Sequence, residues 1–467
     1  MSDSSHNQEH ALFSSLPLRP ELLQALGGAH YDRMTAIQAA SASEILAGRD
    51  ILAQAQTGSG KTVAFAIGIL NKLEISLFET QALVICPTRE LSDQVAEVIQ
   101  RLASGLANTR VLTLCGGKPM HDQLTSLKRE PHVVVGTPGR LKKHLEKGTL
   151  NVSNVKTLVL DEADRMLDMG FYEDIMSILE ETSQNRQTLL FSATYPNEIT
   201  RISQSIQNDP VNVKVASNNH TVQIDQLFVL AKEEQKLETL YRALGKFQPE
   251  NAIIFCNRKK HVQALCDTLT QAGYHARALH GDLDQRERDE AILLFANKSI
   301  SLLIATDVAA RGLDISGLSA VINYDITPDP ENHVHRIGRT GRAGMEGLAI
   351  TLFEPDEEYR VRAIEEFMET SFEFGELQAS DKDSGSVSTP PTRTLQLSAG
   401  KKDKIRPGDI VGALTASEEL LKEDIGKIKV QAKVAFVAVA YAKAKTALKI
   451  ISEERIKKKN VRARIIR

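Results

Sequence analysis

The stretch Ala55-Gln-Thr-Gly-Ser-Gly-Lys-Thr62 decides the fold of this chain. It follows a strand-like run, Asp50-Ile-Leu-Ala53, and it precedes an apolar helical stretch, Val63-Ala-Phe-Ala-Ile-Gly68. A buried strand, a glycine-rich turn and a helix in this order are typical of a phosphate-binding loop in an α/β fold. A plain glycine-rich turn would not account for the Gly-Lys-Thr ending and both flanks together.

The residue types of this loop suit a nucleotide phosphate. Gly58 and Gly60 let backbone amides turn inward around phosphate oxygens, and the helix that follows adds the positive end of its dipole. We expect Lys61 to reach the β- and γ-phosphates and the Thr62 hydroxyl to ligate Mg²⁺. Ala55 stands where the usual pattern has its first glycine.

Apolar runs like the one before this loop recur through the first 370 residues or so, separated by longer helical stretches. Continuous apolar strands that alternate with helices indicate parallel sheets buried on both faces, so the predicted fold class is α/β. The runs are Ala82–Cys86, His132–Val135, Thr157–Leu160, Thr188–Phe191, Ala252–Phe255, Ser301–Ala305 and Ala320–Asn323.

A phosphate-binding loop needs a partner carboxylate for its metal ion. The run Leu158-Val-Leu160 leads directly into Asp161-Glu-Ala-Asp164, which places acids at the end of a predicted parallel strand, where ligands of such sheets bind. We expect Asp161 to hold Mg²⁺ and Glu162 to orient or deprotonate the attacking water. A solvent-exposed helix N-terminus is the alternative for these four residues taken alone.

With these motifs the sequence resembles the DEAD-box family of RNA helicases, whose name comes from Asp161-Glu-Ala-Asp164, and the ordered match runs from about residue 13 to 345. The resemblance implies two RecA-like lobes that hydrolyse ATP on binding RNA and locally unwind duplexes. The predicted bounds are an N-terminal lobe over residues 1–215, a linker over 216–223, a C-terminal lobe over 224–370, a flexible linker over 371–392 and an RNA-binding domain over 393–467; the linkers are indicated by their polar composition.

The resemblance also implies roles for individual residues. In the segment His30–Gln38, which departs from the family at His30, Met34 and Ala36, Gln38 would read the adenine edge, with Phe13 stacking on the base. Arg339 and Arg342 would be arginine fingers that stabilise the transferring γ-phosphoryl group. The other residues implied in ATP binding are Thr57, Gly58, Ser59, Gly60, Lys61, Thr62 and Asp314. Those implied in coupling the two lobes are Ser192, Thr194, Asp164 and His335.

RNA contacts are implied for a third set of residues, which follow predicted strands and track the sugar-phosphate backbone rather than the bases. In the first lobe they are Pro87, Thr88, Arg89, Gly117, Thr137, Gly139 and Arg140, and in the second lobe Arg288 and Thr306.

The last 75 residues form a separate basic unit. From Arg393 to Arg467 there are 19 Lys/Arg and 8 Asp/Glu, a net charge of +11, although the whole chain carries −3. Such a charge suggests a polyanionic partner. The order strand, basic loop, helix, strand, strand, helix, strand fits a small RRM-like α/β domain. The usual stacking aromatics are largely missing, since Gln396 and Val434 hold platform positions.

Two basic segments, Lys401–Leu414 and Arg455–Arg464, resemble the C-terminal domain of bacterial DEAD-box proteins that recognise a hairpin of 23S ribosomal RNA during assembly of the large (50S) subunit. The resemblance implies 23S rRNA in pre-50S particles as the partner. The expected contact residues are Lys401, Lys402, Lys404, Arg406, Lys457, Lys458 and Arg462.

Two other functions stay open at this point. One is a general RNA helicase in mRNA turnover, and the other is an ATP-dependent RNA clamp with a non-specific basic tether.

No apolar run reaches about 18 residues, so no membrane span is expected. The four cysteines form no CxxC pair, which argues against zinc and disulfide frameworks. We expect a cytoplasmic monomer.

Overall fold

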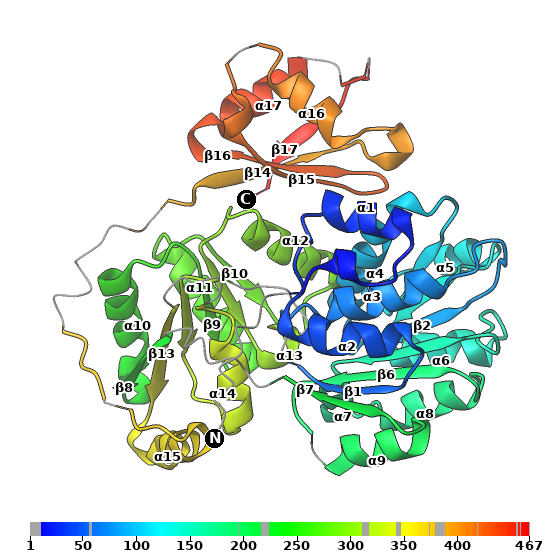
Figure 1. Ribbon diagram of the computed structural model, residues 1–467. Coiled ribbons are helices and arrows are strands. Elements are labelled where there is room, and N and C mark those ends of the chain that lie inside the picture. The colour runs from blue at the N-terminus through cyan, green and yellow to red at the C-terminus, as the bar shows by residue number, and fades with distance from the viewer. Residues whose placement is uncertain are drawn as a thin grey trace. The chain divides into compact units, whose positions relative to one another are not determined.

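The structure is a computed structural model that describes residues 11–55, 58–195, 197–215, 224–310, 317–341, 347–372, 374–378, 387, 389–417, 419–453, 456–457 and 459–466. These residues divide into two compact units, the first ending at Val215 and the second starting at Ile224. Figure 1 shows the elements of both.

The first unit contains a parallel sheet of seven strands among the described residues, in the order β3-β4-β2-β5-β6-β1-β7. Its central strands are buried along their whole length, which explains their continuous apolar sequence. The strands are β1 (Ile51–Gln54), β2 (Ala82–Ile85), β3 (Val111–Leu114), β4 (Val133–Gly136), β5 (Thr157–Asp161), β6 (Gln187–Ser192) and β7 (Val211–Lys214).

Helices cover both faces of this sheet and form two separate cores. One core joins the sheet to α1 to α4, and the other joins it to α5 to α9. The helices are α1 (Pro20–Gly28), α2 (Ala36–Leu46), α3 (Lys61–Lys72), α4 (Arg89–Leu102), α5 (Met120–Leu127), α6 (Pro138–Glu146), α7 (Ala163–Asp168), α8 (Tyr172–Glu180) and α9 (Asn197–Ile206).

The second unit begins with a parallel sheet of six described strands, in the order β10-β11-β9-β12-β13-β8. The strands are β8 (Ile224–Leu230), β9 (Ala252–Phe255), β10 (Ala276–Leu279), β11 (Leu302–Ala305), β12 (Ala320–Asn323) and β13 (Gly347–Phe353). The helices are α10 (Glu233–Phe247), α11 (Lys259–Gln271), α12 (Gln285–Ala296), α13 (Asp307–Ala310), α14 (Pro330–Ile337) and α15 (Glu358–Met368). The two sheets confirm the predicted pair of RecA-like lobes.

Part of the segment expected to be a linker packs on the second lobe. Phe374 forms a parallel bridge with Phe228 of β8, and the Gly375 amide donates to the Phe228 carbonyl oxygen at 2.8 Å. Arg242 donates to the Leu377 carbonyl oxygen at 3.2 Å. The chain is therefore held along the β8 edge as far as Leu377.

The second unit ends in a small antiparallel sheet of order β15-β16-β14-β17, with two helices on one face. Its elements follow the predicted order. They are β14 (Thr392–Leu397), α16 (Pro407–Leu414), β15 (Ile425–Val430), β16 (Ala435–Ala440), α17 (Ala444–Glu453) and β17 (Ala463–Ile465).

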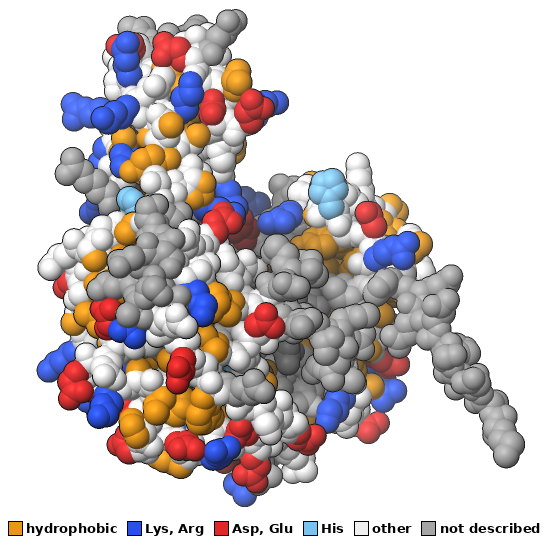
Figure 2. All heavy atoms as spheres, turned by 90° about the vertical axis from the view of Figure 1, so that its left-hand side faces the viewer, with side chains coloured by type: hydrophobic (Ala, Val, Ile, Leu, Met, Phe, Trp, Pro, Cys, Tyr) orange, Lys and Arg blue, Asp and Glu red, His pale blue; other side chains and the backbone are white. Residues whose placement is uncertain are grey.

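The charged side chains, the cysteines and the helix lengths describe the general character of the chain. Figure 2 shows one face, on which positive and negative side chains are interspersed. All four cysteines are buried and free. Among the described helices, none has both the length and the apolar character needed to cross a bilayer.

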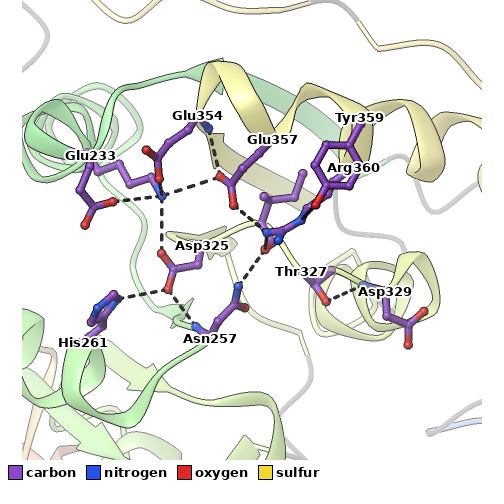
Figure 3. Close-up of polar contacts among 12 residues, drawn as sticks. Glu233, Asn257, His261, Asp325, Thr327, Asp329, Glu354, Glu357, Tyr359 and Arg360 are labelled. Carbon is purple, nitrogen blue, oxygen red and sulfur yellow. Dashed lines mark hydrogen bonds and ion pairs between the residues drawn. The ribbon is translucent and has the colours of Figure 1, made fainter.

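Acidic side chains surround a buried lysine, Lys236, at one edge of the second sheet. Figure 3 labels these acids, which are Glu233, Asp325, Glu354 and Glu357. The Lys236 side chain is 3% exposed, and its Nζ lies 3.0 Å from Glu354, 3.5 Å from Glu233, 3.6 Å from Asp325 and 3.9 Å from Glu357. Burial alone would lower the pKa of Lys236, but the hydrogen bond to Glu354 and the charges of Asp325 and Glu357 outweigh it and raise that pKa. Lys236 therefore compensates the carboxylates of the segments that follow both β12 and β13.

Replacing Gly136 at the end of β4 tests the packing of the first lobe. A Cβ there would lie 2.5 Å from the Leu114 carbonyl oxygen and 2.8 Å from Leu141 Cδ2, and Leu141 is fully buried. We expect Gly136→Ala to lower the free energy of unfolding by about 1–3 kcal/mol, because this core has no room to expand. Urea unfolding measures the loss. Gly27→Ala in α1, where nothing lies within 4 Å of the new Cβ, is the control and should not destabilise; equal losses in both variants would contradict the packing argument.

Removing the Lys236 ammonium should leave several carboxylates without compensation. We expect Lys236→Met to destabilise the second lobe by about 3 kcal/mol, as for a buried ion pair that loses one partner. The loss should shrink as the pH falls toward the pKa of carboxyl groups, because protonation removes the uncompensated charge. Urea midpoints across this pH range give the result. Lys259→Met, which breaks an exposed pair with Asp282, is the control and should change the midpoint little.

Candidate ATP and RNA site

Parallel strand order brings the predicted motifs of the first lobe to one sheet edge. The phosphate-binding loop follows β1, Asp161 ends β5 and Ser192 ends β6, and these three strands are neighbours in the order β5-β6-β1. The predicted RNA motifs follow β2, β3 and β4, which are neighbours in the order β3-β4-β2. The carboxyl edge thus carries the predicted ATP motifs on one half (the ATP half) and the predicted RNA motifs on the other (the RNA half), and the two halves meet between β2 and β5.

The described part of the phosphate-binding loop has the expected backbone. Gly58 and Gly60 adopt positive φ angles of 81° and 93°, which favour glycine. Gln38 Nε2 donates to the Gly60 carbonyl oxygen at 2.9 Å, and Gln38 Oε1 accepts from the Thr35 amide at 2.8 Å. A Cβ on Gly60 would lie 2.5 Å from Gln38 Nε2. Gln38, the residue predicted to read adenine, therefore also holds the phosphate-binding loop in place. Thr57 lies outside the described residues.

Two other residues of the predicted adenine segment have specific environments. Phe13 is 2% exposed and packs into the core of the first lobe. Its stacking on adenine stays a prediction. His30, where the family has glycine, adopts a φ of 60°, a left-handed conformation that costs a non-glycine residue about 1 kcal/mol. The backbone turn thus forms despite the substitution.

A buried ion pair lies beneath the loop. Lys61 is 4% exposed, Asp161 is fully buried, and Lys61 Nζ lies 3.1 Å from Asp161 Oδ1. Burial would lower the pKa of Lys61, but Asp161 and Glu162 outweigh it and raise that pKa. Burial also raises the pKa of Asp161, in spite of Lys61. Within the described residues, neither Asp161 oxygen receives a hydrogen bond of good geometry, so the carboxylate retains the capacity to bind a cation.

The arrangement fits Mg²⁺ better than a metal held by protein alone. The described residues contain no cluster of three or more His, Cys, Asp or Glu side chains placed to hold a metal. Mg²⁺ commonly takes one or two protein oxygens and completes its shell with phosphate and water. Asp161 and Thr62 are the two protein oxygens that the sequence predicts for this site.

Glu162 is held in an unusual conformation. Its φ of 56° is left-handed, and its carboxylate, 2% exposed, accepts a hydrogen bond from Arg165 at 2.9 Å. Such a backbone costs of order 1–3 kcal/mol and persists where the surroundings enforce it, often at functional sites. Arg165, which no sequence motif marked, fixes this carboxylate next to Asp161.

The predicted coupling residues of the first lobe contact one another. Asp164 Oδ2 accepts hydrogen bonds from the Ala193 amide at 3.0 Å, the Thr194 amide at 2.9 Å and Thr194 Oγ1 at 3.2 Å. Ser192 Oγ accepts from the Asp164 amide at 3.3 Å and donates to the Thr194 carbonyl oxygen at 2.7 Å. These hydrogen bonds join the segment after β6 directly to the segment that carries Asp161.

The RNA half of the edge is also tied together. Arg140 donates to the Lys118 carbonyl oxygen at 3.1 Å and to Gln123 Oε1 at 3.0 Å, which joins the loop after β4 to the loop after β3. Thr88 Oγ1 caps α4 by accepting from the Leu91 amide at 3.2 Å. The structure thus places the motifs around Arg140 and Gly117 side by side, through Gln123, a buried residue that no sequence motif marked.

Arg336 is the centre of the corresponding edge in the second lobe. Its side chain is 1% exposed and binds Asp307 in a bidentate manner at 2.6 and 2.7 Å. It also donates to Asn257 Oδ1 at 2.9 Å and to the Asp325 carbonyl oxygen at 2.8 Å. Arg336 lies between the predicted site residues His335 and Arg339 but had no predicted role of its own, because its partners lie 11 to 79 residues away.

The remaining candidates of the second lobe lie on several of its elements. Thr306 follows β11 directly, His335 is the residue before Arg336 in α14, and Arg339 is buried just beyond the helix. Arg288 lies half-buried in the first turn of α12. Asp314 and Arg342 lie outside the described residues.

The basic segments of the C-terminal domain converge on one edge. Lys457 Nζ donates to the Lys404 carbonyl oxygen at 2.8 Å and pairs with Asp409 at 3.0 Å. Lys459 Nζ pairs with Asp403 at 3.1 Å. The residues expected to contact RNA are exposed there, namely Lys401, Lys402, Lys404, Arg406, Lys457 and Arg462, while Lys458 lies outside the described residues.

Family comparisons agree with this three-part organisation. Residues 35–202 match the DEAD/DEAH box helicase family, residues 235–344 match the helicase conserved C-terminal domain, and residues 394–465 match the DbpA RNA binding domain. The three matches cover the two parallel-sheet lobes and the small antiparallel domain in turn.

Individual relatives extend the similarity over nearly the whole chain. The ATP-dependent RNA helicase DbpA of Escherichia coli (strain K12) is 47% identical over 97% of this chain and 99% of its own length. The DEAD-box ATP-dependent RNA helicase CshA of Geobacillus kaustophilus is 46% identical over 76% of each chain. The structure of S. cerevisiae Dbp5 bound to RNA and ADP BeF3 covers 80% of this chain and 97% of its own, with a TM-score of 0.72 and 29% identity. The chain belongs to the DEAD-box family of ATP-dependent RNA helicases and carries a DbpA-type RNA-binding domain.

Proposed function

We propose that this helicase is directed by its C-terminal domain to a hairpin of 23S rRNA and remodels RNA in pre-50S particles, as a cytoplasmic monomer. The observation that carries the proposal is the basic edge, defined as Lys401, Lys402, Lys404, Arg406, Lys457 and Arg462. Two segments about 50 residues apart in sequence meet there through the Lys457–Lys404 hydrogen bond. A structured hairpin offers closely spaced phosphates that such an edge can bind.

The ATP half of the first lobe supports a specific division of roles. Lys61 would bind the β- and γ-phosphates, while Asp161 and Thr62 would hold Mg²⁺, which supplies neutralisation of phosphate charge when bound. Glu162 would orient the attacking water and accept its proton. Arg339 and Arg342 from the second lobe would stabilise charge on the transferring phosphoryl group. Gln38 and Phe13 would contact adenine, and Asp314 the ribose.

Two lobes with separate half-sites predict mutual dependence of ATP and RNA binding. If both ligands bind more tightly when the lobes close, each raises the affinity for the other by the same factor. Ser192 and Thr194 bond Asp164 within the first lobe, and with His335 of the second lobe they would relay closure to the hydrolytic groups. Contacts from Thr88, Arg89, Gly117, Arg140, Arg288 and Thr306 would hold one strand by its backbone.

Replacing Glu162 isosterically tests its role as the base. We expect Glu162→Gln to lower kcat for ATP hydrolysis by about 10²–10⁴-fold, because the amide cannot accept the proton. Binding of ATP and RNA should persist, since the amide oxygen can still accept from Arg165. Single-turnover hydrolysis and fluorescence binding measure the two properties separately. Hydrolysis at the wild-type rate by this variant would exclude the assignment.

A comparison of two RNAs tests the target. We expect steady-state ATPase activity at fixed salt to be stimulated strongly by a 23S rRNA fragment with the peptidyl-transferase-centre hairpin and an adjacent duplex. An unrelated structured RNA of equal length and charge should stimulate weakly, because phosphate contacts alone do not select a sequence. Equal stimulation by both would leave a general RNA helicase with a non-specific tether. Stimulated ATPase without strand separation would indicate a clamp.

Paired charge changes locate the selectivity within the C-terminal domain. Lys401→Ala with Arg406→Ala removes two charges from the basic edge, and Lys445→Ala with Lys449→Ala removes two from exposed positions of α17. Both pairs lower the net charge equally, so a loss of non-specific attraction would be the same in both. Only the first pair should abolish the preference for the ribosomal fragment, because only this pair lies on the basic edge. Equal effects of the two pairs would reduce the domain's role to non-specific attraction.

A further inference from the structure

The sheet of the C-terminal domain has one face that does not pack on its own helices. Leu395, Leu397 and Val437 point to the opposite face and form the core with α16 and α17. Because side chains alternate along a strand, Thr394 of β14 and its cross-strand neighbour Ala438 of β16 belong to the first face. Yet Thr394 is 0% exposed and Ala438 1%. This face, on which an RRM-type domain would ordinarily stack bases, is therefore covered around Thr394 and Ala438, whereas the next pair along it, Gln396 and Phe436, is half-buried.

Residues of the second lobe contact this face. Asn297, which follows α12, donates from Nδ2 to Thr394 Oγ1 at 3.0 Å. Ser299 Oγ lies 2.8 Å from Thr394 Oγ1 and 3.0 Å from Thr392 Oγ1. The Thr392 hydroxyl also donates to the Asn297 carbonyl oxygen. Four hydrogen bonds thus join two strand residues to two residues of one short turn, and Asn297 is itself 6% exposed.

An aromatic contact borders these hydrogen bonds. Tyr441, just after β16, meets the His275 ring edge-on at 6.1 Å, and the Arg393 guanidinium lies 4.1 Å above the Tyr441 ring. Burial, followed by the charges of Arg393 and Arg277, lowers the pKa of His275, so the ring is neutral in this contact. Tyrosine and arginine are the residue types that contribute most at protein interfaces.

We propose that this sheet face, formed by Thr392, Thr394 and Tyr441, is a docking surface for the turn Asn297–Ser299 of the second lobe and not an RNA-stacking platform. The basic edge lies beyond the opposite end of β14, since Lys401 follows Leu397 whereas docking involves Thr392 and Thr394. Docking therefore leaves the basic edge accessible. It fixes the RNA-binding domain to the C-terminal end of α12, whose first turn carries Arg288.

A disulfide cross-link tests docking without any RNA, so its outcome does not depend on the proposed rRNA target. Ser299→Cys with Thr392→Cys places two sulfurs where hydroxyl oxygens lie 3.0 Å apart, within reach of a disulfide. The four native cysteines are buried and should not compete. The control pair, Ser299→Cys with Ser398→Cys, uses an exposed residue about 20 Å farther along the strand direction. We expect the first pair to close at least about tenfold faster; equal rates would overturn the proposal.

Substitutions from opposite sides of the contact sharpen the test. Thr394→Val, added to the cross-linking pair, keeps strand propensity but leaves the Asn297 amide without its partner, so cross-linking should slow about fivefold. Asn297→Ala changes only the second lobe and should have a similar effect. Thr415→Val removes a hydroxyl that bonds within α16 and is the matched control, with no change expected. No slowing by either test variant would contradict the assigned hydrogen bonds.

The oxidised cross-linked protein separates docking from RNA stacking. Its affinity for a fluorescent RNA hairpin with a single-stranded extension should equal that of the reduced protein, because the basic edge stays free. A loss of RNA binding on oxidation, regained on reduction, would mean that the sheet face itself binds RNA and would overturn the proposal.

Discussion

Parallel pairing of the strands is the constraint on which the rest of the structure depends. In both lobes every strand pair is parallel within the described residues, so all strands end at the same edge of their sheet. Motifs that lie far apart in sequence then become neighbours without specific attraction between them. The order of the strands within the sheet decides which of these loops lie next to one another. It groups the loops after β1, β5 and β6, which carry the predicted ATP motifs, and those after β2, β3 and β4, which carry the predicted RNA motifs.

Buried ion pairs then hold the side chains at these sheet edges in a defined geometry. Lys61–Asp161 lies at the carboxyl edge of the first sheet and Arg336–Asp307 at the matching edge of the second. Lys236 compensates four acids beside it. Such pairs contribute little net stability, since desolvation offsets their attraction. Their value lies in geometry, because a buried charge that leaves its partner is strongly penalised. Lys61, which is predicted to meet phosphate, is thereby held in place by Asp161.

How far the sequence predicts the structure depends on whether the determining contacts are local. The apolar runs became β2, β4, β5, β6, β9, β11 and β12 nearly at their predicted bounds, because strand burial is encoded by neighbouring residues. Gly60 was predicted from its motif, but its hydrogen bond with Gln38 was not. Arg336 and Gln123 were missed for the same reason, since each is defined by partners that only the fold brings close. The packing of Phe374 on β8 likewise depends on a strand about 146 positions earlier.

In the C-terminal domain, the structure offers a reason for the scarcity of aromatic side chains on the sheet. The scarcity of stacking aromatics on its sheet predicted a poor platform for single-stranded RNA, and the structure places Thr392 and Thr394 of that face against the turn Asn297–Ser299. Small hydroxyl side chains suit a close protein contact, whereas large exposed aromatics suit bases. A domain that recognises RNA through a charged edge can use its sheet face for attachment. A docked domain also adds orientation to the high local concentration that a tether provides, because bound RNA then meets the motor in a limited set of positions.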